Sequence, residues 1–133
     1  MAKLPKFQNA DLLHQALTHR SLPNHNERLE FIGDGILQGV VTARLSQQFP
    51  DRSEGFLSKK RESLVKNHAL AQVARRMNLG QHLYLSKGTI KQGGRKNAKI
   101  LADAIEALIG AYFIDRGYNY VAAERFVQKL LGF

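Results

Sequence analysis

Apolar residues recur every three or four positions along most of the chain, which is the period of an amphipathic α-helix. The pattern predicts six helices and no parallel sheet. The predicted helices span residues 11–19, 27–49, 54–65, 67–78, 98–117 and 119–131. With 133 residues the chain is long enough for one domain with its own core. The expected fold is therefore all-α, in a single domain.

The segment 27–49 is hydrophobic over more than half of its circumference. We therefore expect it to be the central, buried helix of the fold. Asn26 directly precedes this segment and is a good N-cap for it. By contrast, residues 81–97 show no sustained period and contain three glycines, so this stretch is predicted to be a loop.

Two of the apolar helices also carry acidic residues at helical spacing. Glu27, Glu30 and Asp34 stand at i, i+3 and i+7 on one helix, and Asp103 and Glu106 stand at i and i+3 on another. At about 100° per residue, each set lies on one face of its helix. Carboxylates placed beside a hydrophobic core repel one another and need a partner that neutralises them.

Salt bridges to Arg28 or Lys99 are the simpler explanation for any one of these acids. Acidic sets on two otherwise apolar helices favour a metal site instead. Carboxylate oxygens without histidine or cysteine nearby suit a hard cation such as Mg²⁺ or Mn²⁺. In phosphodiester hydrolysis such an ion activates a water molecule and stabilises charge on the leaving oxygen.

The overall charge of the chain indicates a polyanionic partner. Twenty Lys and Arg residues against eleven Asp and Glu residues give a formal net charge of +9 and a pI near 10.1. Such a surface is typical of proteins that bind nucleic acid or membranes, although a merely soluble basic protein is the simpler alternative. The chain has no cysteine, no signal-peptide apolar region and no apolar run of about 18 residues. We expect no membrane span and a cytoplasmic location.

The stretch NERLEFIGDGIL, residues 26–37, resembles the signature of the ribonuclease III family, which is close to NERLEFLGDAVL. This chain has Ile32 where the family usually has Leu, and Gly35 where it usually has Ala or Ser. Three further stretches resemble family segments in the family's order, and the resemblance covers roughly residues 10–131. These stretches are LLHQALTHRS (12–21), EGFLSKKRESLV (54–65) and ILADAIEALIGAYFIDRG (100–117).

This resemblance implies a helical, Mg²⁺-dependent endonuclease domain that cuts double-stranded RNA, as an obligate homodimer with both active sites in one cleft. The products would carry 5′-phosphate and 3′-hydroxyl ends with a short 3′ overhang. Bacterial members process ribosomal-RNA precursors and messenger RNA. The family's metal-binding carboxylates correspond to Glu30, Asp34, Asp103 and Glu106, of which Asp34 and Glu106 are the most directly catalytic, and two further cleft acids correspond to Glu27 and Glu54.

Phe31 lies inside the signature, where periodicity alone makes it an ordinary core residue. The resemblance implies instead that Phe31 packs into a pocket of the partner subunit. Gly33, Gly35 and Gly39 on the same helix would allow close approach by a second subunit or by another helix of the same chain. His19 follows an apolar helical run, and we expect it to be a hydrogen-bonded structural residue rather than a general base.

Two basic runs are candidates for contact with RNA. A solvated basic face is the usual alternative for either run alone, but both flank the predicted metal site. We therefore favour contacts with phosphates, with little base specificity. The candidate residues are Lys59 and Lys60 in one run, and Lys87, Lys91, Arg95, Lys96 and Lys99 in the other.

Full-length bacterial members of the family carry a double-stranded-RNA-binding domain after the nuclease domain. We expect residues 1–133 to be the catalytic domain alone, in a truncated or a naturally short form, and the intact signature favours truncation. Two alternatives remain open for the function. A non-catalytic, ribosome-associated RNA-binding domain is disfavoured by the intact acids, and a phosphohydrolase of small nucleotides is disfavoured by the basic runs.

Overall fold

Seven α-helices and two short 3-10 turns make up the computed structural model, which describes residues 3–133. The helices are α1 (Ala10–Ala16), α2 (Glu27–Gln48), α3 (Glu54–Val65), α4 (Asn67–Arg76), α5 (Lys87–Lys91), α6 (Ala98–Asp115) and α7 (Tyr120–Leu131), and the turns are η1 (Leu79–His82) and η2 (Gly94–Lys96). These residues contain no strand, only an isolated parallel bridge between Thr18 and Tyr84. The all-α prediction is confirmed, and all six predicted helices are present.

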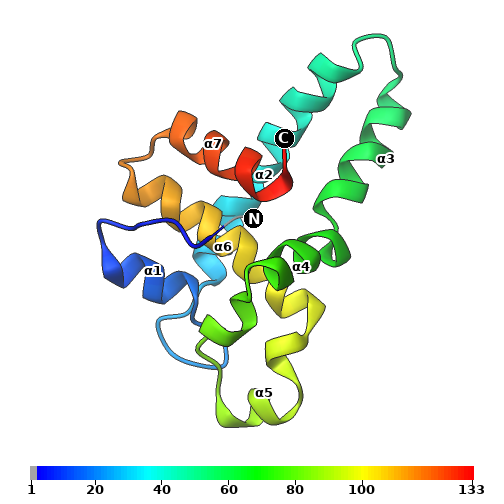
Figure 1. Ribbon diagram of the computed structural model, residues 1–133. Coiled ribbons are helices and arrows are strands. Elements are labelled where there is room, and N and C mark those ends of the chain that lie inside the picture. The colour runs from blue at the N-terminus through cyan, green and yellow to red at the C-terminus, as the bar shows by residue number, and fades with distance from the viewer. Residues whose placement is uncertain (1–2) are drawn as a thin grey trace.

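The core is built around α6, against which α1, α2, α4 and α7 pack (Figure 1). Buried positions occur all around α6, from Leu101 to Ala111. The prediction that residues 27–49 form the central buried helix is only partly right. Buried positions of α2 run from Leu29 to Leu45, whereas its C-terminal end runs outward and pairs with α3 in a projecting helical hairpin (Figure 1). No residue of α3 is fully buried.

The crossing of α2 and α6 is a direct contact between two backbones. A methyl group on Gly33 would collide with the carbonyl group of Glu106, and one on Gly110 would collide with the carbonyl oxygen of Leu29. Gly33 therefore serves a helix crossing within one chain, which is the second of the two roles considered for it. Gly35 is different, because a side chain there would meet nothing within 4 Å.

The predicted capping role of Asn26 is wrong in its detail. Asn26 does precede α2, but its side chain makes no capping hydrogen bond. Its buried amide instead donates to the carbonyl oxygen of Ala16 over 2.9 Å, and its backbone N–H donates to Thr18 over 3.0 Å. Asn26 therefore fastens the start of α2 to the end of α1, which fixes the segment between these helices.

Residues 81–97 are more ordered than the predicted loop. Ser86 accepts a hydrogen bond from the backbone N–H of Thr89 over 3.3 Å and so caps α5, a signal that the three glycines obscured. Just before it, Tyr84 donates to the carbonyl oxygen of Leu17 over 2.9 Å and accepts from the N–H of His19 over 3.0 Å. These bonds attach the stretch that leads into α5 to the segment after α1.

None of the helices in the described part of the chain combines the length and hydropathy needed to span a bilayer.

Replacing Gly110 by Ala tests the importance of the crossing. We expect Gly110→Ala to lower the free energy of unfolding by at least about 1–3 kcal/mol, the usual cost of overpacking a core. Gly35→Ala, on the open face of α2, should raise stability by about 0.5–1 kcal/mol because alanine restricts the unfolded chain. Urea unfolding of both variants measures the difference. Equal stabilities would contradict a backbone contact at this crossing.

Candidate metal centre

Three carboxylates meet where α2 crosses α6. Oxygen atoms of Glu30, Asp103 and Glu106 all lie within 4.8 Å of one another, and each of these residues is partly buried. Glu30 comes one turn before Gly33, and Asp103 and Glu106 precede Gly110 on α6. The close crossing of the two helices therefore brings together acids that are far apart in the sequence.

Glu106 is the most strongly perturbed member of this cluster. Burial, followed by a side-chain hydrogen bond with Asp34 and by the charge of Asp34, raises the pKa of Glu106 to about 9. Asp34 itself is exposed and stands one turn after Glu30 on α2. A hydrogen bond between two carboxyl groups requires a proton, so Glu106 holds a proton at neutral pH in the absence of a cation.

Glu30 is perturbed for a related reason. Burial, followed by the charge of Asp103 and a hydrogen bond with it, raises the pKa of Glu30 to about 7. Lys99 partly offsets this repulsion, since its Nζ lies 3.2 Å from Oδ2 of Asp103. Of the three clustered acids, Asp103 alone fits the salt-bridge explanation, because Glu30 and Glu106 form no ion pair among residues 3–133.

The donor set of the cluster fits a hard divalent cation. It offers only carboxylate oxygens, from helices that fix their positions, and the charge of neighbouring acids helps to raise the pKa of Glu30 and Glu106. A bound cation would relieve that repulsion, and Mg²⁺ and Mn²⁺ prefer such ligands. Glu30, Asp103 and Glu106 would hold the ion directly, and Asp34 lies beside them next to Glu106.

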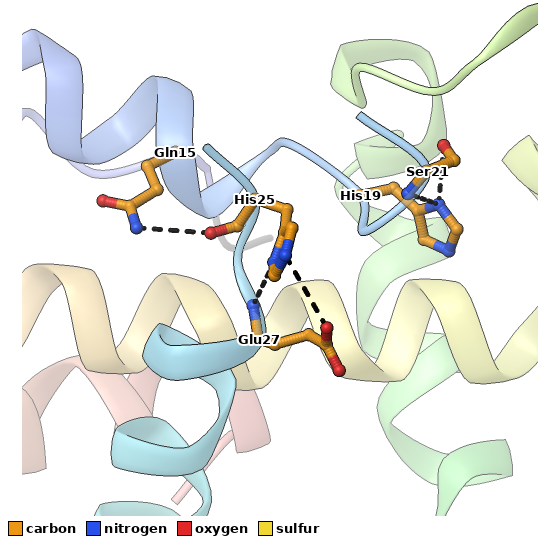
Figure 2. Close-up of polar contacts among 5 residues, drawn as sticks. All are labelled: Gln15, His19, Ser21, His25 and Glu27. Carbon is orange, nitrogen blue, oxygen red and sulfur yellow. Dashed lines mark hydrogen bonds and ion pairs between the residues drawn. The ribbon is translucent and has the colours of Figure 1, made fainter. Parts of the chain in front are cut away.

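The two further predicted acids lie in different places. Glu27, at the start of α2, is exposed and held by His25, whose Nδ1 accepts from the Glu27 backbone N–H over 3.4 Å and whose Nε2 lies 3.7 Å from the Glu27 carboxylate (Figure 2). Glu27 lines the same pocket as Glu30. Glu54 begins α3 on the projecting hairpin, where Ser58 donates to its carboxylate over 2.8 Å. The fold of one chain does not bring Glu54 to the cluster.

The predicted RNA-binding residues fall into separate groups. Lys87 and Lys91 on α5 are exposed, as is Lys96 in η2. Arg95 is half-buried, and its guanidinium donates to the carbonyl oxygens of Gly80 and Leu83 over 2.9 and 2.8 Å. Those bonds indicate a structural role for Arg95, and its contact with RNA stays a prediction.

The other basic run is carried by α3. Lys59 and Lys60 are exposed there, on the projecting hairpin, whereas α5 lies at the opposite end of the molecule (Figure 1). The two basic groups therefore do not form one continuous surface within a single chain.

A pocket of about 320 Å³ opens beside the cluster, and Glu30 and Asp103 form part of its wall. His19 and Arg20, from the segment between α1 and α2, also line this pocket. Sequence reasoning assigned these residues no part in the site. The available signal was the polar HRS stretch directly after an apolar helix, which hydrophobic periodicity does not explain.

The raised pKa values predict how stability depends on pH in a chelating buffer. A group whose pKa is higher in the folded than in the unfolded chain stabilises the fold below its unfolded pKa and loses that contribution as pH rises. The melting temperature should therefore fall as pH rises from about 5 through the values near 7 and 9. Glu106→Gln should weaken this fall and melt above the wild type at pH 9.

Glu62→Gln provides the matched control for that measurement, because Glu62 is exposed on α3. It should reproduce the wild-type pH profile. A Glu106→Gln variant that melts far below wild type across the range would show that Glu106 neutralises a buried cation instead.

The chain matches the family model described as Ribonuclease-III-like over residues 9–132. It is 51% identical over 115 residues to Ribonuclease 3 of Bordetella petrii, an alignment that covers 86% of this chain and 46% of that protein. It is also 51% identical over 111 residues to Ribonuclease 3 of Shewanella oneidensis, covering 83% of this chain and 49% of that protein. The chain thus spans about half the length of these curated relatives.

The fold is similar to that of the nuclease domain of ribonuclease III from Campylobacter jejuni. The TM-score is 0.89 at 38% sequence identity, over 95% of this chain and 86% of that one. A second structure of that nuclease domain, described as showing flexibility in a region involved in dimer formation, gives a TM-score of 0.86 at 38% identity over 96% and 92% of the two chains. Sequence and fold agree that the chain belongs to the ribonuclease-III-like family.

Proposed function

We propose that this chain is the catalytic domain of a Mg²⁺-dependent endoribonuclease that cuts double-stranded RNA. The observation that carries the proposal is the convergence of Glu30, Asp103 and Glu106 at one helix crossing in a ribonuclease-III-like chain. The products are 5′-phosphate and 3′-hydroxyl ends with a short 3′ overhang. Its natural substrates are ribosomal-RNA precursors and structured messenger RNA.

The chemistry assigns distinct tasks to the carboxylates. When bound, a Mg²⁺ ion would supply an activated water molecule and would neutralise charge on the oxygen that leaves. Glu30, Asp103 and Glu106 would hold the ion. Asp34 lies next to Glu106 and would add a further negative charge beside the ion. Water adds to phosphorus, and the 3′ oxygen departs and takes up a proton, which gives the stated ends.

RNA recognition on this chain is carried by charge more than by base contacts. Lys87, Lys91 and Lys96 lie exposed near the site end of the molecule, and such side chains can follow the phosphates of an A-form duplex. A domain that binds RNA without cutting it is disfavoured, because a self-repelling acidic cluster would weaken its hold on phosphates.

The active form is a homodimer in which Phe31 packs against the second copy. The side chain of Phe31 is 79% exposed, so Phe31 is not the core residue that periodicity suggested. An exposed phenylalanine on an otherwise well-packed helix favours an interface, since a large apolar side chain gains from leaving water. A dimer would also let Glu54 and the lysines of α3 act in a site shared with the partner.

The rate at which the Glu106→Gln variant cleaves an RNA duplex tests the catalytic proposal. With Mg²⁺ the wild type should cut a long RNA duplex, and with EDTA it should not. The glutamine variant should lose orders of magnitude in rate, because an amide is a poorer ligand for a hard cation, while its fold and duplex binding survive. Gel analysis of cleavage and end-labelling of the products measure this. A folded variant that cleaves at the wild-type rate would remove Glu106 from the site.

Truncation of Phe31 tests the dimer. Light scattering of the wild type at micromolar concentration should give twice the chain mass of 15.0 kDa. Phe31→Ala should raise the dissociation constant at least about a hundredfold, because losing a buried phenylalanine typically costs about 3–5 kcal/mol. Ile90→Ala, an exposed apolar residue on α5, should leave the mass unchanged. A monomeric wild type would refute the proposed assembly.

A further inference from the structure

The pocket beside the acidic cluster is lined by hydrogen-bond donors as well as by acids. Glu27, Glu30 and Asp103 contribute carboxylates, whereas His19, Arg20 and Asn97 contribute donors. Arg20 is exposed and forms no ion pair among the described residues. The Oδ1 atom of Asn97 already accepts from the N–H of Ile100 over 3.0 Å, so its amino group is the part left to bind a ligand.

The hydrogen bonds of His19 fix its tautomer. Its Nδ1 accepts from the backbone N–H of Ser21 over 3.1 Å and lies 2.9 Å from the Ser21 hydroxyl oxygen (Figure 2). A backbone N–H can only donate, so Nδ1 carries no proton. The single proton of the neutral ring is therefore on Nε2, which points away from Ser21 in Figure 2.

The environment of His19 keeps the ring neutral. Burial, followed by the charge of Arg20, lowers the pKa of His19 below its ordinary value. The ring, which lines the pocket, therefore carries a neutral Nε2–H donor. This arrangement agrees with the expectation that His19 is not a general base, because its free nitrogen already holds a proton.

The ring is also held in place from the side of α5. The hydroxyl oxygen of Ser21 accepts from the backbone N–H of Ser86 over 3.0 Å, which leaves the Ser21 hydroxyl hydrogen for Nδ1 of His19. Ser86 in turn caps α5. The donor of His19 is thus fixed relative to both the acidic cluster and the helix that carries Lys87 and Lys91, before any ligand arrives.

We propose that this pocket binds a phosphate of the RNA strand next to the phosphate that is cut, with the Nε2–H of His19 as a direct donor. The inference rests on the proposed function. His19, Arg20 and the amino group of Asn97 offer donors, and phosphates are the strongest acceptors along RNA. Because Glu30 and Asp103 line the same pocket, a phosphate held there neighbours the scissile one.

Two substitutions separate the donor of His19 from its structural role. In His19→Asn the shorter amide oxygen can still accept from the N–H of Ser21, as asparagine does in Asx turns, but no donor remains where Nε2 stood. His19→Gln carries its amide farther out and restores a donor near that position. His68→Asn on α4, an exposed histidine, is the matched control.

The substrate is a short RNA duplex with one cut site, in which a methylphosphonate replaces one flanking phosphate at a time. His19→Asn should lower kcat/KM on unmodified duplex roughly ten- to hundredfold, the range for one hydrogen bond to a charged acceptor, with an unchanged melting temperature. His19→Gln should recover part of this loss. At one flanking linkage, methylphosphonate should slow the wild type by a similar factor and slow His19→Asn no further.

Two results would overturn the assignment. One is a folded His19→Asn variant that cleaves at the wild-type rate. The other is a methylphosphonate that slows His19→Asn as much as it slows the wild type at every flanking linkage. Duplex affinity measured in EDTA with the same variants and substrates repeats the comparison without cleavage. The wild type could show this non-additive effect of His19→Asn and one methylphosphonate on binding, yet fail to cut with Mg²⁺. That result would refute the proposed function and support the phosphate pocket.

Discussion

The contact between the backbones of α2 and α6 is the constraint on which the rest of the molecule depends. Gly33 and Gly110 leave no room for side chains between the two helices. Helices this close bring their neighbouring side chains together at short range, so Glu30, Asp103 and Glu106 meet beside the crossing. The same crossing organises the core, because buried positions of α6 continue on either side of it.

The acidic cluster destabilises the fold at the same place where it would hold a cation. Burial of Glu106 and the neighbouring acids raise its pKa, which favours the protonated form. The surrounding hydrophobic core offsets that cost through the area it removes from water. A site of this kind is prepared for a cation because its ligands are held together by packing that does not depend on the ion.

The sequence predicted the helices and the acidic faces well, since both follow from residue spacing within one element. The side chains of Ser53 and Asn119 cap α3 and α7, as these residue types commonly do at helix N-termini. What failed were features set by tertiary context. Asn26 is a residue type that commonly caps helices, but its side-chain amide donates to the carbonyl oxygen of Ala16 instead. Periodicity likewise predicted that Phe31 lies in the core, whereas it is exposed, because spacing alone does not identify which apolar positions remain uncovered.

The carboxyl proton on Glu106 has a consequence for how the site takes up a cation. Any divalent ion that binds this oxygen near neutral pH must displace a proton, because the metal and the proton compete for the same lone pairs. Ion uptake is then coupled to proton release, and affinity climbs with pH until Glu106 ionises unaided near pH 9. The occupancy of the centre at a fixed ion concentration thereby becomes a readout of the acidity around the protein.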